Sequence, residues 1–124
     1  MILDKTGDIM QALISDIEIV KWVSKVNGVP NISANKTPSA VFPAIVVYEI
    51  LNGDSKFADD KVVRSKLSYQ ISLYSLNGSH TKVQQNVDKF MREMGFTLNF
   101  AGTAQDTDTK IFQRDLKYKG EFDI

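Results

Sequence analysis

Hydrophobic and polar residues alternate most regularly in the stretch SKLSYQISLYSL, residues 65–76. Period-two alternation with one apolar face is typical of a half-buried antiparallel strand. The other face is polar but largely uncharged, so it suits water or a polar partner. The apolar face consists of Leu67, Tyr69, Ile71 and Leu73, and the polar face of Lys66, Ser68, Gln70 and Ser72.

The preceding apolar stretch, FPAIVVYEIL (residues 42–51), has hydrophobic side chains at nearly every position. This pattern predicts a strand with both faces covered. Pro43 has no N–H to donate, so we place it at the start of the strand. The turn signal Asn52-Gly53-Asp54 follows, and after it the polar stretch SKFADDKVV. That stretch is too polar for a core, and it fits either a mobile loop or the wide end of a hairpin.

An apolar stripe near the N-terminus repeats at helical spacing. Ile9, Leu13 and Ile17 lie four residues apart, which predicts an amphipathic helix. Asp16 offers the start signal of a short second helix or of a bend in the first one. The segment NGVP (27–30) is expected to end this helical region.

Another helix is predicted after residue 78, with Ser79 as its N-cap. Gly95 fits the left-handed position at its C-terminal end. Two strands are predicted next, at residues 97–104 and 110–122, with a turn at residues 105–108 between them. The apolar stripe of the helix consists of Val83, Val87, Phe90, Met91 and Met94.

The order of these elements is one or two helices, two strands, a helix and two strands, with residues 31–40 as a loop. It favours an α+β fold: an antiparallel sheet of about four strands with two main helices packed on one face. A length of 124 residues suits one domain with a real core. We therefore predict a single domain over residues 1–124.

Amino-acid composition and charge exclude several classes of function. The net charge is zero and there is no cysteine. A balanced charge argues against a protein that mainly neutralises nucleic-acid phosphates, and the lack of cysteine excludes disulfides, thiolate metal sites and cysteine catalysis. No apolar run approaches the roughly 20 residues that span a bilayer. The N-terminal sequence MILDKTGD lacks the apolar core of a secretory signal, so we expect a cytoplasmic protein without membrane contact.

Candidate chemical residues are few. His80 is the sole histidine, and we expect it on the solvated surface because no partner ligand for a metal lies at helical spacing. The carboxylate pairs Asp59-Asp60 and Asp106/Asp108 lack the spacing of a calcium loop, which favours solvated charges. No phosphate-binding or nucleophile motif is present. We therefore expect no catalytic, cofactor-binding or metal-binding residues, no cofactor and no enzymatic activity.

Two further groups have alternative interpretations. Lys117 and Lys119 flank Tyr118, as in the basic and aromatic interleaving of nucleic-acid binders, but an ordinary solvated strand face fits the zero net charge better. Trp22 and Val26 could form an exposed partner-binding patch, although such residues more often pack on their own domain.

Five features between residues 40 and 100 form a pattern. They are Phe42-Pro43 at the start of a strand, Tyr48-Glu49 near its end, a polar loop ending in ADDK, the strand SYQISLYS (68–75), and a helix closing on Met94-Gly95-Phe96. This pattern resembles the small tail-completion proteins of long-tailed bacteriophages, called tail terminators or head–tail joining proteins. Ala44 departs from the bulkier residue that the family often has after Phe-Pro.

The resemblance implies a subunit that forms a ring, commonly six-fold, which caps the tail tube and docks to the head connector. Its partners would be further copies of itself, the tail tube protein and the head connector protein, with DNA only passing through the ring. It would reside in the host cytoplasm during assembly and then in the virion. The alternatives are another neck or minor virion component, or a small nucleic-acid-binding α+β domain.

A ring needs two different patches that meet on neighbouring subunits. Long strands with polar outer faces and a long loop can supply them. We expect the polar stretch after residue 52 to order on docking. The candidate partner-binding residues are Gly53, Asp54, Lys56, Phe57, Asp59 and Asp60.

Overall fold

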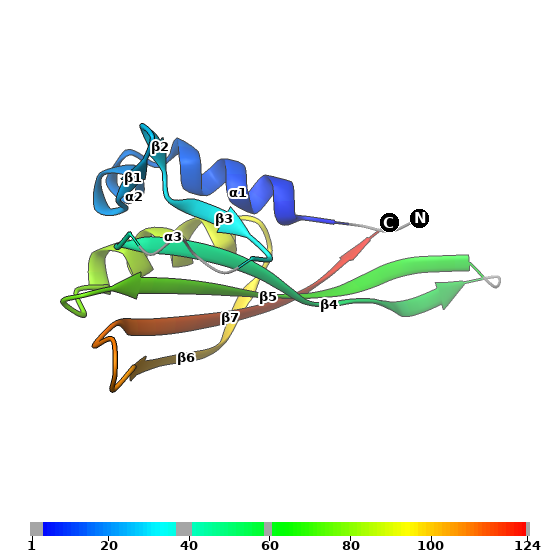
Figure 1. The fold of residues 1–124 in the computed structure, drawn as a ribbon. Coiled ribbons are helices and arrows are strands. Elements are labelled where there is room, and N and C mark those ends of the chain that lie inside the picture. Colours follow the sequence, from blue (N-terminus) through cyan, green and yellow to red (C-terminus); the bar gives the residue numbers. More distant parts are fainter. Residues whose placement is uncertain (1–3, 37–40, 59–60, 124) are drawn as a thin grey trace.

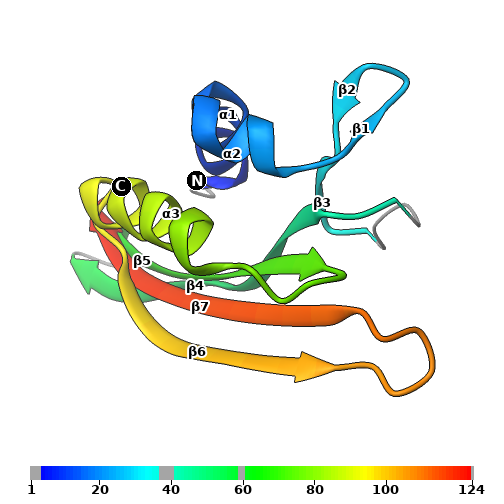
Figure 2. The ribbon, with the colours of Figure 1, turned by 90° about the vertical axis from the view of Figure 1, so that its left-hand side faces the viewer.

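The computed structural model describes residues 4–36, 41–58 and 61–123, with residues 54–58 and 61–63 described by their backbone alone. One large sheet carries all the helices on the same face (Figures 1 and 2). The helices are α1 (Thr6–Ser15), α2 (Ile17–Trp22) and α3 (Thr81–Glu93). The strands are β1 (Lys25–Val26), β2 (Val29–Pro30), β3 (Ile32–Ala34), β4 (Ala44–Ala58), β5 (Lys61–Ser75), β6 (Thr97–Gln105) and β7 (Phe112–Asp123).

The large sheet has five strands in the order β3-β4-β5-β7-β6, and β1 and β2 form a separate pair. β3 runs parallel to β4, whereas the other neighbours are antiparallel. The prediction of an antiparallel sheet of about four strands with two main helices is therefore wrong. The described residues form a five-stranded mixed sheet, a small hairpin and three helices, and they are mostly β.

Two short strand regions account for much of the difference. Residues 31–40 were expected to be a loop, but Ile32–Ala34 pair with Ile45–Val47. The segment NGVP was expected to end a helix, yet Asn27 and Gly28 form the turn that joins β1 to β2, with φ values of 52° and 79°. Positive φ at both central residues is what a tight two-residue hairpin requires.

The core lies between the sheet and the helices. The apolar face predicted for β5 is confirmed, because its four side chains are fully buried. Burying one such side chain stabilises the fold by about 1.5–3 kcal/mol relative to leaving it exposed. The predicted α3 stripe packs into the same cluster. Its members include Leu67, Tyr69, Ile71 and Leu73 from β5, Ile9 and Leu13 from α1, and Val83, Val87 and Met91 from α3.

Local signals at the helix ends are partly as expected. The Asp16 carboxylate accepts hydrogen bonds from the backbone N–H groups of Glu18 and Ile19, at 2.9 and 3.1 Å, and so starts α2. Gly95 has a φ of 97°, which confirms its left-handed role after α3. The N-cap of α3 is His80 rather than Ser79. Among the described residues, none of the helices has the length and apolar character needed to cross a membrane.

Candidate functional site

The most conspicuous feature is a β-hairpin arm, which we define as residues 51–58 of β4 and 61–68 of β5. The two strands remain paired as far as Ala58 and Lys61, and Figure 1 shows them extending beyond the helices. β7 accompanies β5 only as far as Arg64. Of the two alternatives for the polar stretch after residue 52, the structure therefore shows the hairpin.

The candidate partner-binding residues belong to this arm. Gly53 lies in β4 with a backbone that a side chain would fit without strain. Asp54, Lys56 and Phe57 also lie in β4, where they pair with Ser65, Arg64 and Val62 respectively. Asp59 and Asp60 lie outside the described residues. The docking role of this set remains a prediction.

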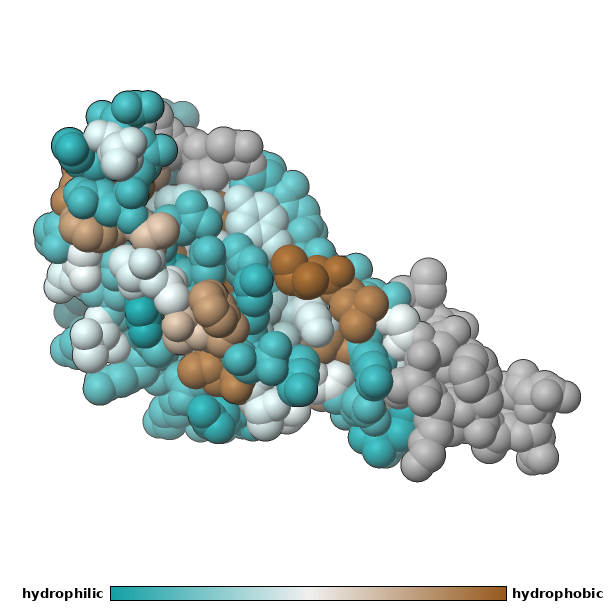
Figure 3. All heavy atoms as spheres, turned by 90° about the horizontal axis from the view of Figure 1, so that it is seen from below, coloured by the Kyte–Doolittle hydropathy of each residue, from teal (hydrophilic) through white to brown (hydrophobic). Residues whose placement is uncertain are grey.

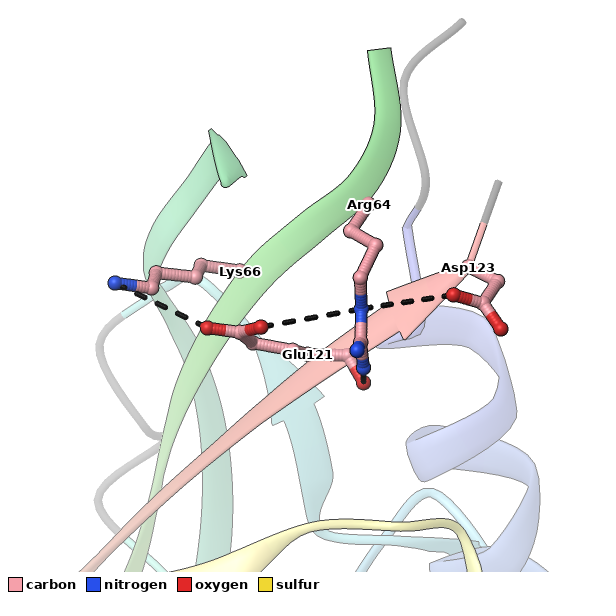
Figure 4. A network of polar contacts seen from close by, with 4 residues as sticks. All are labelled: Arg64, Lys66, Glu121 and Asp123. Atoms are coloured by element: carbon pink, nitrogen blue, oxygen red, sulfur yellow. Dashed lines mark hydrogen bonds and ion pairs between the residues drawn. The ribbon is translucent and has the colours of Figure 1, made fainter. Parts of the chain in front are cut away.

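Four charged residues connect the root of the arm to the end of β7 (Figure 4). The Arg64 guanidinium Nε lies 3.8 Å from a carboxylate oxygen of Glu121 and 3.5 Å from one of Asp123. Its Nη2 donates a hydrogen bond of 3.2 Å to the Glu121 backbone carbonyl. The Lys66 ammonium lies 4.0 Å from the other Glu121 oxygen. These groups are partly exposed, so each ion pair contributes at most about 1 kcal/mol, and the network mainly orients the arm.

The face of the sheet opposite the helices is mostly hydrophilic (Figure 3), with small separate hydrophobic spots, one of which adjoins the arm. Leu51, at the root of the arm, is 47% exposed, and Phe100 on β6 is 49% exposed. A shallow hollow of about 470 Å³ opens beside Leu51. It is lined by Leu51, Lys66, Leu67, Ser68, Thr97, Lys119, Gly120 and Glu121.

Side-chain hydrogen bonds organise the middle of this outer face. Ser72 donates to the Asp115 carboxylate at 2.8 Å and accepts from the Gln70 amide at 2.9 Å. Gln113 also donates to Asp115, at 2.9 Å. Because these polar groups bond with one another across β5 and β7, the face is a preformed polar surface.

Around Tyr118 the structure does not show the interleaving of basic and aromatic side chains that was the less favoured of the two interpretations. Tyr118 is buried, and its hydroxyl donates to Asp88 on α3 at 3.0 Å. Burial, with that hydrogen bond and the Asp88 charge, raises the pKa of the Tyr118 hydroxyl well above its usual value. Lys117 and Lys119 are exposed, and Lys117 lies 5.2 Å from the centre of the Phe100 ring. One such contact is ordinary for a strand face.

His80 is not on the surface as predicted, because it is only 4% exposed. Its Nε2 lies 3.0 Å from the Ser75 hydroxyl oxygen, and its ring centre is 6.0 Å from that of Trp22. Burial, with a smaller contribution from the positive charge of Arg114, lowers the pKa of the His80 imidazole. The sequence pattern missed this because the residues that cover His80 come from distant segments.

The other candidate residues have structural roles. Trp22 is half-buried against the core, and its indole N–H donates to the Ser79 carbonyl at 3.1 Å, so it joins α2 to the segment before α3. Val26 is half-buried in the β1–β2 hairpin. Asp106 accepts hydrogen bonds from the N–H groups of Asp108 and Thr109 at 2.8 and 2.9 Å, which lower the pKa of its carboxyl. Nowhere in the described chain do three potential metal ligands gather.

Comparison with known proteins gives a fold relationship. No protein-family model matches the chain. No curated protein sequence matches it either. The fold is similar to that of a chain from the virion of a native gene transfer agent particle, with a TM-score of 0.59 and 10% sequence identity. The match covers 94% of this chain and 92% of that chain. At this identity the similarity shows a shared fold.

Proposed function

We propose that this protein is a structural subunit of a phage-type virion. The observation that carries the proposal is the similarity to a chain of a gene transfer agent virion, which spans nearly the whole length of both chains. A match confined to a common sheet motif would carry much less weight, because common folds host many functions. Here the match covers 94% of this chain, which is far more than one motif.

The more specific role that we propose is tail completion by an oligomeric ring at the junction of tail and head. The sequence pattern from Phe42-Pro43 to Met94-Gly95-Phe96 supports this position. The arm and the opposite edge of the sheet, formed by β6, are two different surfaces, as a head-to-tail ring requires. The partners would be the tail tube protein and the head connector protein.

We further propose that the protein acts without catalysis. A catalytic site needs a nucleophile or base whose reactive atom can reach a substrate. The histidine is buried against Ser75 and Trp22. The hollow beside Leu51 opens onto the outer face of the sheet and is lined by two leucines together with lysine, glutamate and small polar side chains. This lining suits contact with another protein.

Electron microscopy of the purified protein, alone and mixed with its cognate tail tubes, tests the proposal. We expect rings, and densities that cap one end of each tube and halt its growth. Tube ends that stay bare and continue to grow at saturating protein would contradict tail completion. Binding to DNA that weakens steeply with salt would favour the nucleic-acid-binding alternative.

A further inference from the structure

The large sheet has two edges without a strand neighbour in the described chain. β6 forms one edge over its full length, since it pairs only with β7. β4 forms the other edge beyond Val47, where its pairing with β3 ends. An edge strand presents backbone N–H and C=O groups that can pair with another chain.

The β6 edge has few of the devices that normally prevent such pairing. Its sequence, TLNFAGTAQ, contains no charged residue and no proline, and most of its side chains are exposed. Its one register irregularity lies near the start, between Leu98 and Phe100. Natural edge strands are usually protected by lysine, proline, bulges or short length. A nine-residue uncharged edge is therefore suited to receive another strand.

The β4 edge is divided sharply into a covered and an uncovered part. The Asn35 N–H donates to the Val47 carbonyl at 2.8 Å, and the Glu49 N–H donates to the Asn35 side chain at 3.0 Å. Asn35 thus closes the part covered by β3. The following segment, residues 50–58, has β5 as its strand neighbour. Its length is similar to that of β6.

We propose that β6 of one copy pairs antiparallel with residues 50–58 of β4 in the next copy, so that the sheet continues from subunit to subunit. This inference rests on the proposed ring and names its contact. β4, β5, β7 and β6 alternate in direction along the sheet, so β6 runs opposite to β4. A rotation that moves one subunit sideways along the sheet therefore brings the two edges together antiparallel, without a flip of either subunit.

The strand register also specifies how neighbouring copies are offset. Ala101, at the centre of β6, pairs with Leu116 of β7, which pairs with Ile71 of β5. Ile71 in turn pairs with Val47 of β4, in the part of β4 that is covered by β3. The centre of the uncovered segment is Asp54, which pairs with Ser65, six residues along β5 from Ile71. Six residues correspond to about 20 Å.

This offset agrees with the geometry of closed sheets. From β4 of one copy to β4 of the next, the proposed sheet crosses four strand spacings of roughly 4.8 Å, which is about 19 Å. An offset of about 20 Å over that width corresponds to a strand tilt of about 45°. Closing a sheet into a ring requires a tilt of about 35–45°. Pairing of β6 with the uncovered segment is therefore compatible with a closed ring.

Disulfide trapping tests the contact, because the natural chain contains no cysteine. In the proposed register Ala104 faces Leu51 of the next copy. Oxidation of the full-length Ala104→Cys/Leu51→Cys variant should give a ladder of covalent oligomers ending at the ring size. The Ala104→Cys/Val29→Cys variant is the control, since Val29 is exposed on the β1–β2 hairpin, away from both edges. It should give no ladder, and each single-cysteine variant should give dimers at most.

Two further double variants, Ala104→Cys with Ile50→Cys and Ala104→Cys with Gly53→Cys, test strand registers that are shifted slightly from the proposed one. If microscopy shows rings but none of the three pairs cross-links above the control, edge pairing is overturned while the proposed function stands. If lone subunits cap the tubes and no oligomer forms, edge pairing is overturned and the virion role is kept in part. Bare tubes together with a full covalent ladder would overturn tail completion and support the contact.

A second pair of variants tests the edge without cysteine. Ala104→Lys places a charge on the exposed β6 edge, whereas Thr107→Lys places the same charge in the turn beyond it. We expect Ala104→Lys to abolish rings at an unchanged melting temperature and Thr107→Lys to leave them intact. Rings that persist in Ala104→Lys, or that are lost equally in both variants, would overturn the inference.

Discussion

The two halves of β4 differ in burial and in their strand neighbours. Residues 44–47 are completely buried and have β3 and β5 on either side. The half that begins at Leu51 extends past β3, and Leu51 itself is 47% exposed. One end of β4 is therefore part of the hydrophobic core. The other end, on our proposal, contacts other proteins during assembly. Stability and partner contact can therefore be changed separately by mutations along one strand.

Truncation of the core beside the covered half should have the largest effect. Ile71 is fully buried and pairs with Val47. Ile71→Ala should lower the free energy of unfolding by about 2–5 kcal/mol, because it leaves a cavity that the rigid sheet cannot close. Urea unfolding measures this loss.

Ser68→Ala is the matched control, since Ser68 lies on the outer face of the same strand. It should change the unfolding free energy by no more than about 0.5 kcal/mol. Equal effects of the two substitutions would show that the two faces of β5 do not differ as the structure indicates.

The buried His80 should make the stability of the body depend on pH. Its pKa lies below the ordinary value of 6.5, so the unfolded chain binds the proton more readily than the folded chain. The stabilisation is therefore complete above about pH 6.5 and is lost as the pH falls through the lowered pKa of the folded state. Urea unfolding between pH 8 and 5 should show this decline.

His80→Gln should reduce that decline, because glutamine does not titrate. If wild type and variant lose stability in parallel over this range, other groups cause the pH dependence. The side-chain partners of His80, Ser75 and Trp22, lie outside the arm, so hydrogen exchange in residues 51–53 should change little between pH 8 and 6 once the intrinsic pH dependence of exchange is corrected for.

The sequence predicts the covered half better than the arm for a physical reason. The period of two in β5 and the continuous apolar run in β4 are local signals, and both predicted strands form. The predicted turn at residues 52–54 is wrong, however, because these residues lie within β4, which continues to Ala58. β3 is three residues long and depends on the distant partner Ile45–Val47, so its own residues give too short a pattern to recognise. The resulting error concerned the order and number of strands.

The candidate site was only partly predictable for a related reason. The polar stretch after residue 52 carries no apolar face, and its hairpin depends on register with residues 61–68. Similarly, His80 is covered by Trp22, which belongs to a helix much earlier in the chain. The hairpin of the arm and the burial of His80 both depend on contacts between separate segments, which the pattern of a single segment does not reveal.

Breaking the ion network at the root of the arm should have a small effect. Glu121→Gln removes the charge that Arg64 and Lys66 share. We expect a loss of at most about 1 kcal/mol, because the groups are partly exposed. A double-mutant cycle with Arg64→Ala, measured at low and high salt, separates this coupling from other effects. A coupling of several kcal/mol would place the network within the stabilising core instead.

The smallest effect on stability is expected at the far end of the arm. The backbone of Phe57 pairs with Val62, beyond the reach of β7, and its side chain lies outside the described residues. Phe57→Ser should leave the melting temperature nearly unchanged and weaken the capping of tail tubes, because a partner-facing aromatic often anchors a contact. Val29→Ser, at another exposed apolar position, is the control and should leave capping intact.

Hydrogen exchange along β4 provides an independent measurement of the difference between its buried first half and the arm. In the unassembled subunit, amides of residues 45–47 should exchange through global unfolding, whereas those of residues 53–58 should exchange faster through local opening of the two-stranded arm. Ring formation, or addition of tail tubes or connector, should slow exchange in residues 53–58 and leave exchange in residues 45–47 unchanged. A large fall in melting temperature for Phe57→Ser, with slow exchange in the free arm, would place Phe57 in the core. The arm would then share the stabilising role of the first half of β4 and lose its assignment as a docking element.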